Sequence, residues 1–194
     1  NVKHTGSGAD IALSSDGTSL LLDGTAIGGG GGSPTLYAES LSGATSPTAT
    51  GTNSVAIGSD AQATATNGSI AFGTATRASG NANAAIGYQA NAAGVGALAT
   101  GGNATALTNS YASGSNSFAA AIANNTSSYG ATGANSIAMG DRSSASGSRG
   151  IAIGGYGALA SGASSLAFGY QATANQSYAS GFGYASKAYG QYSW

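Results

Sequence analysis

The sequence is poor in the residues that carry most protein chemistry. Its 194 residues include no cysteine, one histidine and only 6% Asp, Glu, Lys and Arg. The lack of cysteine excludes disulfides and thiolate chemistry, and a charged fraction far below the typical ~25% leaves solubility to Ser, Thr, Asn and Gln. No run approaches the ~18 apolar residues of a membrane span, so we expect no direct membrane insertion.

The few charged residues are segregated along the chain. Five of the six acids lie at or before Asp60, four of the five basic residues lie at or after Arg77, and none lies between Ala78 and Gly140. Nucleic-acid binding needs clustered Lys and Arg, so nucleic acid is excluded as a partner. Hydrolysis of a polysaccharide needs paired carboxylates, and metals need clustered ligands. Only Asp141 follows Asp60, so we predict no enzyme, no metal and no cofactor.

Glycine, by contrast, is abundant, with 34 residues, and most of the glycines lie at the ends of the units of a repeat. The phrase from Asn53 to Gly58 recurs as far as the C-terminus. We assign its copies to Ser69–Gly73, Ala84–Gly87, Ala97–Gly101, Ser110–Gly114, Ser136–Gly140, Gly150–Gly154, Ser165–Gly169 and Ser177–Gly181. The closing glycines follow one another at a nearly constant spacing, and we interpret the one wide interval, from Gly114 to Gly140, as two units. A fixed period of this kind indicates an ordered solenoid.

Each unit predicts two strands and no helix. Large and small residues alternate in the phrase, with Val55 and Ile57 set against Ser54 and Ala56, which is the two-residue period of a strand. An alanine-rich stretch follows each copy, as in 61–65. We therefore expect two strands of about five residues per turn, joined by tight bends in which Gly and Asn supply positive φ values. The fold class is all-β, a parallel β-solenoid.

Alanine on the second strand predicts a roll with a thin core that cannot stand alone. The larger apolar residues of the first strand would then form a stripe that recurs on every turn, and such a stripe on a soluble protein needs a partner. Self-association about a symmetry axis would bury it. We predict an interface between identical chains made of Val55, Ile57, Ile70, Phe72, Ile137, Met139, Ile151, Ile153, Leu166 and Phe168.

The composition divides the chain into three parts. Residues 1–27 contain two β-prone runs around Asp16-Gly17 and predict a short hairpin segment. Residues 28–52 begin with five glycines and are rich in Ser, Thr and Pro, which indicates a linker. Residues 53–194 form the roll. The Ile122–Gly130 segment, which follows an out-of-phase stretch, is expected to be a bulge or outward loop, or a degenerate repeat without a role.

The repeats resemble the YadA-like head repeat of trimeric autotransporter adhesins and are similar to modules in phage tail fibres. The resemblance covers about Thr52 to Tyr189. It implies a left-handed parallel β-roll, a homotrimer, and an extracellular place on a bacterial surface or in a virion fibre. In collagen-binding members the matching phrase carries the ligand motif, although Ala61 stands where the family has a serine. This makes ligand candidates of Asn53, Ser54, Val55, Ala56, Ile57 and Gly58.

Aromatic residues accumulate towards the C-terminus, where six of the ten tyrosines lie from Tyr156 onward. Tyrosine and tryptophan are enriched where proteins bind partners. One interpretation is a receptor-binding tip, and the other is a cap on the last turn and on the symmetry axis. The first interpretation makes ligand candidates of Arg149, Tyr170, Tyr178, Tyr184, Lys187, Tyr189 and Trp194.

These features favour a non-enzymatic trimeric adhesin or receptor-binding head that attaches to a glycan or protein on a host-cell surface. The alternative is a structural spacer of a phage tail fibre or virion appendage. Ice binding is a third possibility, because Thr64 and Thr66, then Thr74 and Thr76, form pairs that a flat threonine array would need. Later turns replace these threonines with other residues, which disfavours it.

Overall fold

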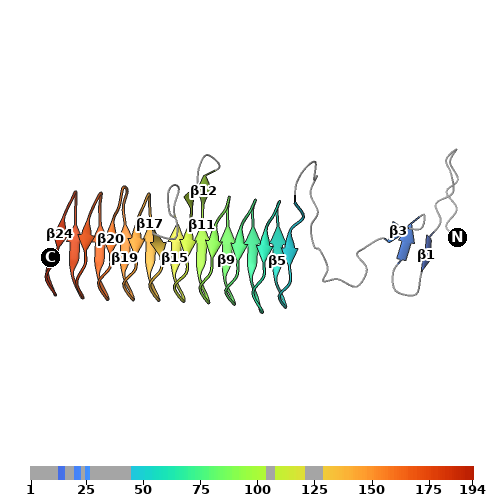
Figure 1. Ribbon diagram of the computed structural model, residues 1–194, viewed down its shortest axis with the longest axis horizontal. Helices are drawn as coiled ribbons and strands as arrows, with labels where there is room; N and C mark the ends of the chain where they lie inside the picture. The colour runs from blue at the N-terminus through green and yellow to red at the C-terminus, as the bar shows by residue number, and fades with distance from the viewer. Residues whose placement is uncertain (1–12, 16–19, 23–24, 27–44, 104–107, 121–128) are drawn as a thin grey trace. The chain divides into compact units, whose positions relative to one another are not determined.

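The computed structural model describes residues 13–15, 20–22, 25–26, 45–103, 108–120 and 129–194. The chain divides into two compact units, Asn1–Ala38 and Glu39–Trp194 (Figure 1). All regular elements of the described residues are strands. In this part of the chain no helix exists that is long and apolar enough to span a membrane.

The first unit contains three short strands in antiparallel order: β1 (Leu13–Ser15), β2 (Leu20–Leu22) and β3 (Thr25–Ala26). Leu13 pairs with Leu22, and Leu21 pairs with Ala26. The turn predicted at Asp16-Gly17 and the glycine run of the predicted linker lie outside the described residues. The hairpin segment therefore stays a prediction.

The second unit is a parallel β-solenoid of two sheets, and the chain alternates between them (Figure 1). One sheet, which we call the apolar-faced sheet, contains β5 (Val55–Ile57), β7 (Ile70–Phe72), β9 (Ala84–Ile86), β11 (Leu98–Thr100), β15 (Phe118–Ala120), β17 (Ile137–Met139), β19 (Ile151–Ile153), β21 (Leu166–Phe168) and β23 (Ser180–Phe182). The other, which we call the polar-faced sheet, contains β4 (Thr48–Ala49), β6 (Gln62–Ala63), β8 (Arg77–Ala78), β10 (Asn91–Ala92), β14 (Tyr111–Ala112), β16 (Gly130–Ala131), β18 (Ser144–Ala145), β20 (Leu159–Ala160), β22 (Thr173–Ala174) and β24 (Lys187–Ala188).

The solenoid and its all-β class are confirmed, but the predicted strand length is wrong. The strands are shorter than expected, with three residues in the apolar-faced sheet and two in the polar-faced sheet, because most of each turn is spent in the two bends. The left-handed sense of the roll stays a prediction from the resemblance.

The core between the two sheets is built from alanine. Nearly every strand turns one alanine inward, and these stack in register, as Ala56 does on Ala71 and Ala63 on Ala78. Among the described residues, every buried hydrophobic side chain is alanine, and the largest fully buried side chain is that of Thr76. The expected thin core is therefore present, and it holds little more than methyl groups.

Glycine closes most strands of the apolar-faced sheet for two reasons. Gly58, Gly73 and Gly87 have φ values of 115°, 126° and 113°, which disfavour any other residue. They also stack closely, since a Cβ added to Gly73 would lie 2.5 Å from the carbonyl oxygen of Gly87. The amide of Gly73 donates to the carbonyl of Ile57 at 2.8 Å, which links consecutive turns.

One predicted copy of the repeat, Ser110–Gly114, lies in the other sheet. Tyr111–Ala112, part of the Ser110–Gly114 copy, forms β14 of the polar-faced sheet and pairs with Asn91–Ala92. The strand of the apolar-faced sheet is Phe118–Ala120, the stretch that looked out of phase. Strands of the two sheets are hard to tell apart in the sequence, because nearly all strands of both sheets have an alanine in their second position.

The last copy of the repeat lies a few residues later than predicted. The strand β23 is Ser180–Phe182, and Gly181 lies beside Ala167 in the register, so it occupies the inward alanine position. The closing glycine is Gly183, with a φ of 99°. The predicted phrase Ser177–Gly181 is therefore corrected to Ser180–Gly183.

Two consecutive turns are longer than the others. Leu98 pairs with Phe118, and Phe118 pairs with Ile137, so each of these turns contains several more residues than its neighbours. The interval between Gly114 and Gly140 is therefore not two units. In the first long turn, β12 (Gly102–Asn103) and β13 (Thr108–Asn109) form an antiparallel pair. Of the expected Ile122–Gly130 bulge, only Tyr129 and Gly130 are described, and Gly130 begins β16.

The roll also begins earlier than predicted. Strand β4 at Thr48–Ala49 pairs in parallel with β6, so it is already part of the polar-faced sheet. The roll therefore starts within the predicted 28–52 linker and not at residue 53. No repeat phrase marks this first strand, because the phrase belongs to the other sheet and first occurs at β5.

Candidate functional site

The outer face of the apolar-faced sheet is a continuous apolar surface. The two residues that flank each inward alanine point outward, and large ones remain exposed in the single chain, including Ile70 at 44% and Phe72 at 52%. None of these outward residues in the described strands is charged. The ten residues predicted to form the interface all lie on this face, and the interface itself stays a prediction.

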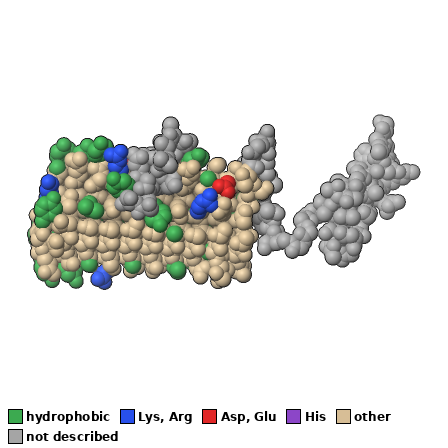
Figure 2. All heavy atoms as spheres, in the orientation of Figure 1, with side chains coloured by type: hydrophobic (Ala, Val, Ile, Leu, Met, Phe, Trp, Pro, Cys, Tyr) green, Lys and Arg blue, Asp and Glu red, His purple; other side chains and the backbone are tan. Residues whose placement is uncertain are grey.

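The outer face of the polar-faced sheet has a different chemistry. Half of its outward strand residues are Ser, Thr, Asn or Gln and two more are Arg77 and Lys187, and Figure 2 shows a face in which hydrophobic side chains are few and scattered. Arg77 and Asp60 form an ion pair with an Nη2–Oδ2 distance of 3.3 Å, and Gln62 donates to the second carboxylate oxygen at 2.8 Å. Both charged side chains are partly exposed, so the pair contributes little to stability.

The structure does not support a threonine array. Thr64 is exposed, but the corresponding residues on the next turns are Ser79 and Ala93, which follow inward Ala78 and Ala92. Thr76 is fully buried, and its hydroxyl donates to the carbonyl of Gly73 at 3.0 Å. The Thr74 and Thr76 pair is therefore not a surface pair.

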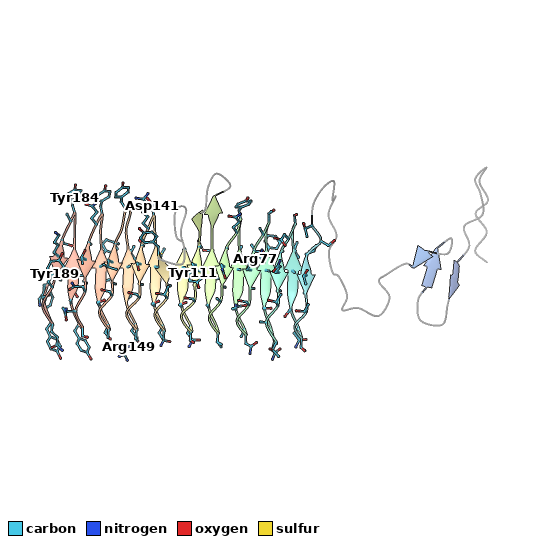
Figure 3. The ribbon with its side chains drawn as sticks, in the orientation of Figure 1. Arg77, Tyr111, Asp141, Arg149, Tyr184 and Tyr189 are labelled. Atoms are coloured by element: carbon cyan, nitrogen blue, oxygen red, sulfur yellow. The ribbon has the colours of Figure 1, made fainter. Side chains whose placement is uncertain are left out.

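Three tyrosines stack along one edge of the roll. The ring centroids of Tyr156 and Tyr170 are 5.5 Å apart, those of Tyr170 and Tyr184 are 5.3 Å apart, and the planes differ by 2° and 4°. The guanidinium of Arg142 lies 4.8 Å from the centroid of Tyr156. Figure 3 places Tyr184 and Asp141 at the same edge. Each ring lies three residues before a strand of the polar-faced sheet, and the first residues of those strands, Leu159, Thr173 and Lys187, are paired in the register of that sheet.

A second stack lies on the opposite edge. The rings of Tyr178 and Tyr192 are 5.1 Å apart and nearly parallel. These two residues share a column of positive φ values with Arg149 and Ser164, joined by backbone hydrogen bonds from turn to turn. Figure 3 shows Arg149 at this edge, away from Tyr184.

The predicted ligand residues therefore do not form one site. Tyr170 and Tyr184 lie on one edge, and Arg149 and Tyr178 on the other. Lys187 belongs to the polar-faced sheet, Tyr189 lies beyond it on the same strand path, and Trp194 is 97% exposed at the last residue. These residues therefore do not lie together in a single compact binding tip.

The six residues from Asn53 to Gly58 each have a different structural role in the turn. Asn53 has a φ of 56°, a conformation that asparagine tolerates. The Ser54 hydroxyl is 2.9 Å from that of Ser69, Ala56 faces inward, and Gly58 closes the strand. Val55 and Ile57 point outward on the apolar face. The phrase thus describes the requirements of one turn, and its ligand role stays a prediction.

Sequence reasoning left three residues of the stacks out of the candidate site: Tyr156, Tyr192 and Arg142. A signal for the tyrosines was present. Tyr156, Tyr170 and Tyr184 recur at one constant interval, Tyr178 and Tyr192 are separated by the same interval, and it equals one turn. The stacking of Arg142 had no such signal, because it depends on the register between neighbouring turns.

The arrangement defines a repeat protein of the β-solenoid class with one apolar face. Within the described ranges no group of three or more His, Cys, Asp or Glu residues could hold a metal ion. The model of the YadA head domain repeat matches residues 49–76, 84–107, 131–156 and 160–180, together about half of the chain. The chain belongs to this family. No curated protein matches it.

The family matches agree with the fold. The gap between residues 107 and 131 covers most of the two long turns, where the period is broken. Head repeats of this family are adhesin repeats and not enzymes, and family members are trimeric in general. Membership therefore indicates an adhesin-like function, exposure at a cell surface and self-association.

Proposed function

We propose that this chain is the head of a homotrimeric adhesin that attaches to a glycan or protein on a host-cell surface. The observation that carries the proposal is the uncharged apolar face, which continues over nine strands and exposes Ile70, Phe72, Met139 and Phe168 in the single chain. Burying one such side chain fully is worth about 1.5 to 3 kcal/mol. A face of this size supports association after its entropic cost.

Three chains side by side would place this face toward a common axis. Closed cyclic symmetry keeps equivalent turns at the same level, so Phe118 of one chain would meet the turn of Phe118 in its neighbours. The polar-faced sheets and both tyrosine edges would remain outside the axis. The trimer thus separates a surface for self-association from the surfaces that meet other molecules.

Ligand contacts would come from exposed side chains outside the apolar face. Tyr156 is covered by Arg142 on one side and Tyr170 on the other, so a sugar ring cannot stack on it. Open ring faces include those of Tyr184, which is 79% exposed and ends its stack, and of Tyr192 and Trp194. Three copies of a weak contact would give useful avidity.

One variant pair tests the association. Ile137→Asp places a carboxylate on the apolar face, where burial without a partner costs several kcal/mol, and we expect loss of the trimer. Gln171→Asp changes an exposed edge residue with a φ of 56°, which aspartate tolerates, and we expect an unchanged mass. Analytical ultracentrifugation gives both results. A monomeric parent chain, or equal effects of the two changes, would refute the proposed interface.

Binding of the parent trimer to glycan arrays and to cells tests adhesion. We expect a signal that Tyr184→Ala with Trp194→Ala weakens without changing the mass. A trimer that binds no surface would favour the other candidate function, a structural spacer of a phage tail fibre or virion appendage, which the scarcity of charge on the roll also suits.

A further inference from the structure

The stacked tyrosines are arranged for a chemical modification that joins neighbouring turns. Three ring pairs lie 5.1 to 5.5 Å apart between centroids, with planes within 5° of parallel. All five rings are exposed to solvent by 41% or more. A diffusible oxidant can therefore reach rings that already lie beside their partners.

We propose that Tyr156–Tyr170, Tyr170–Tyr184 and Tyr178–Tyr192 are sites of oxidative coupling to dityrosine within one chain. The oxidant is a peroxide used by a haem peroxidase, which takes one hydrogen atom from each phenol hydroxyl. The two phenoxyl radicals join through ring carbons ortho to oxygen, and the two ortho hydrogens move to the oxygens. The pair loses two hydrogen atoms, and the peroxide becomes two water molecules.

The fold favours coupling within the chain over coupling between molecules. The parallel register holds each pair on adjacent turns, so the effective concentration of one ring at the other far exceeds that of a second molecule in dilute solution. Exposed tyrosine rings can rotate to bring the ortho carbons together. Tyr170 belongs to two pairs and has two ortho carbons, so it can couple to one neighbour or, after a second oxidation, to both, and a chain carries at most three links.

Coupling would give this chain covalent links between its turns. The chain has no cysteine, so disulfides cannot join its turns. A dityrosine link closes a loop of one turn between neighbouring rings, and such a link restricts the unfolded chain in the same way as a disulfide does. The three pairs all lie in the last third of the roll.

The chain provides its own controls. Tyr189 is 54% exposed, similar to Tyr178, but it has no stacked ring among the described residues. Tyr170→Phe and Tyr178→Phe keep an aromatic ring in each stack but remove the phenol that forms the radical. Tyr189→Phe removes an equally exposed phenol that has no partner.

The experiment treats the dilute full chain with haem peroxidase and hydrogen peroxide, then measures denatured mass and maps linked peptides by mass spectrometry. We expect monomeric chains lighter by two hydrogens per link, with links at the three named pairs. Tyr170→Phe should keep only the Tyr178–Tyr192 link, the double variant should lose all of them, and Tyr189→Phe should match the parent. Links that form mainly between chains, that include Tyr189 as often, or that persist in the double variant would overturn the proposal, as would no links at all.

Discussion

Most turns of the roll have inward and bend positions at which the backbone leaves almost no choice of residue. The inward position takes alanine, because the opposite sheet is close and offers only methyl groups. The closing position takes glycine, because its φ is positive and the next turn lies directly on it. A second column, of glycines that follow the strands of the polar-faced sheet, is restricted as well, because a Cβ at Gly80, Gly94 or Gly114 would lie 1.9 to 2.3 Å from a carbonyl oxygen of the next turn. The outward positions vary, and even the positive-φ column at the edge accepts residues as different as Arg149 and Tyr178.

Replacing a closing glycine should therefore be costly. Gly73→Ala would place a methyl group 2.5 Å from the carbonyl oxygen of Gly87 at a φ of 126°. We expect a loss of about 1 to 3 kcal/mol in the free energy of unfolding, measured by denaturant unfolding.

Gly155→Ala is the matched control. No atom lies within 4 Å of a Cβ at Gly155, and its φ is not positive, so the change should stay within about 0.5 kcal/mol. Equal losses for the two variants would show that the stacking of glycines does not limit the turn.

At the scale of the element, the turn is the unit that the sequence predicts best. The glycines and the alternation around Val55 and Ile57 were sufficient for the parallel solenoid and for the outward apolar face. The prediction exchanged the sheets of the strands at Tyr111 and Phe118. Strands of both sheets carry an inward alanine, and only their outward residues differ. The tyrosine stacks could be located from a spacing of one turn, whereas their division between two edges required the register.

Deletion of a whole turn should preserve the roll. Removing residues 70–83 takes out β7 and β8 together and lets β5 pair with β9, so each remaining strand keeps its sheet. We expect a parallel roll with the same oligomeric state and lower stability, because stability in solenoids is a sum over neighbours. Circular dichroism and the mass in solution check this.

Deletion of half a turn should not be tolerated. Removing residues 70–76 would place Arg77 in the apolar-faced sheet and exchange the sheets of every later strand. We expect aggregation or loss of assembly. If this variant assembled as well as the whole-turn deletion, the assignment of two chemically different faces would be wrong.

The whole roll has two unlike sides. Within the described ranges it contains one ion pair, Arg77 with Asp60, and that pair lies on the polar side. The assembly that we propose would therefore depend on apolar burial and not on charge. The residue pattern predicted the apolar side, but it could not predict how many copies cover it, because a stripe on one chain does not define a symmetry.

High salt should leave the oligomer intact. At about 1 M salt the Debye length is about 3 Å, which removes most attraction between exposed charges. We expect the same mass by analytical ultracentrifugation at low and high salt. Dissociation at high salt would mean that charged groups outside the apolar face hold the chains together.

A core whose apolar side chains are all alanine among the described residues cannot distinguish one turn from another by apolar packing. Ala71, Ala85 and Ala99 present the same methyl group to any neighbour, so the alanine columns hold no information on which strand should follow which. The order of the turns depends on chain connectivity and on the outward columns. Such a protein can gain or lose whole turns without a change in its alanine core. Most differences between its turns then lie on the surface.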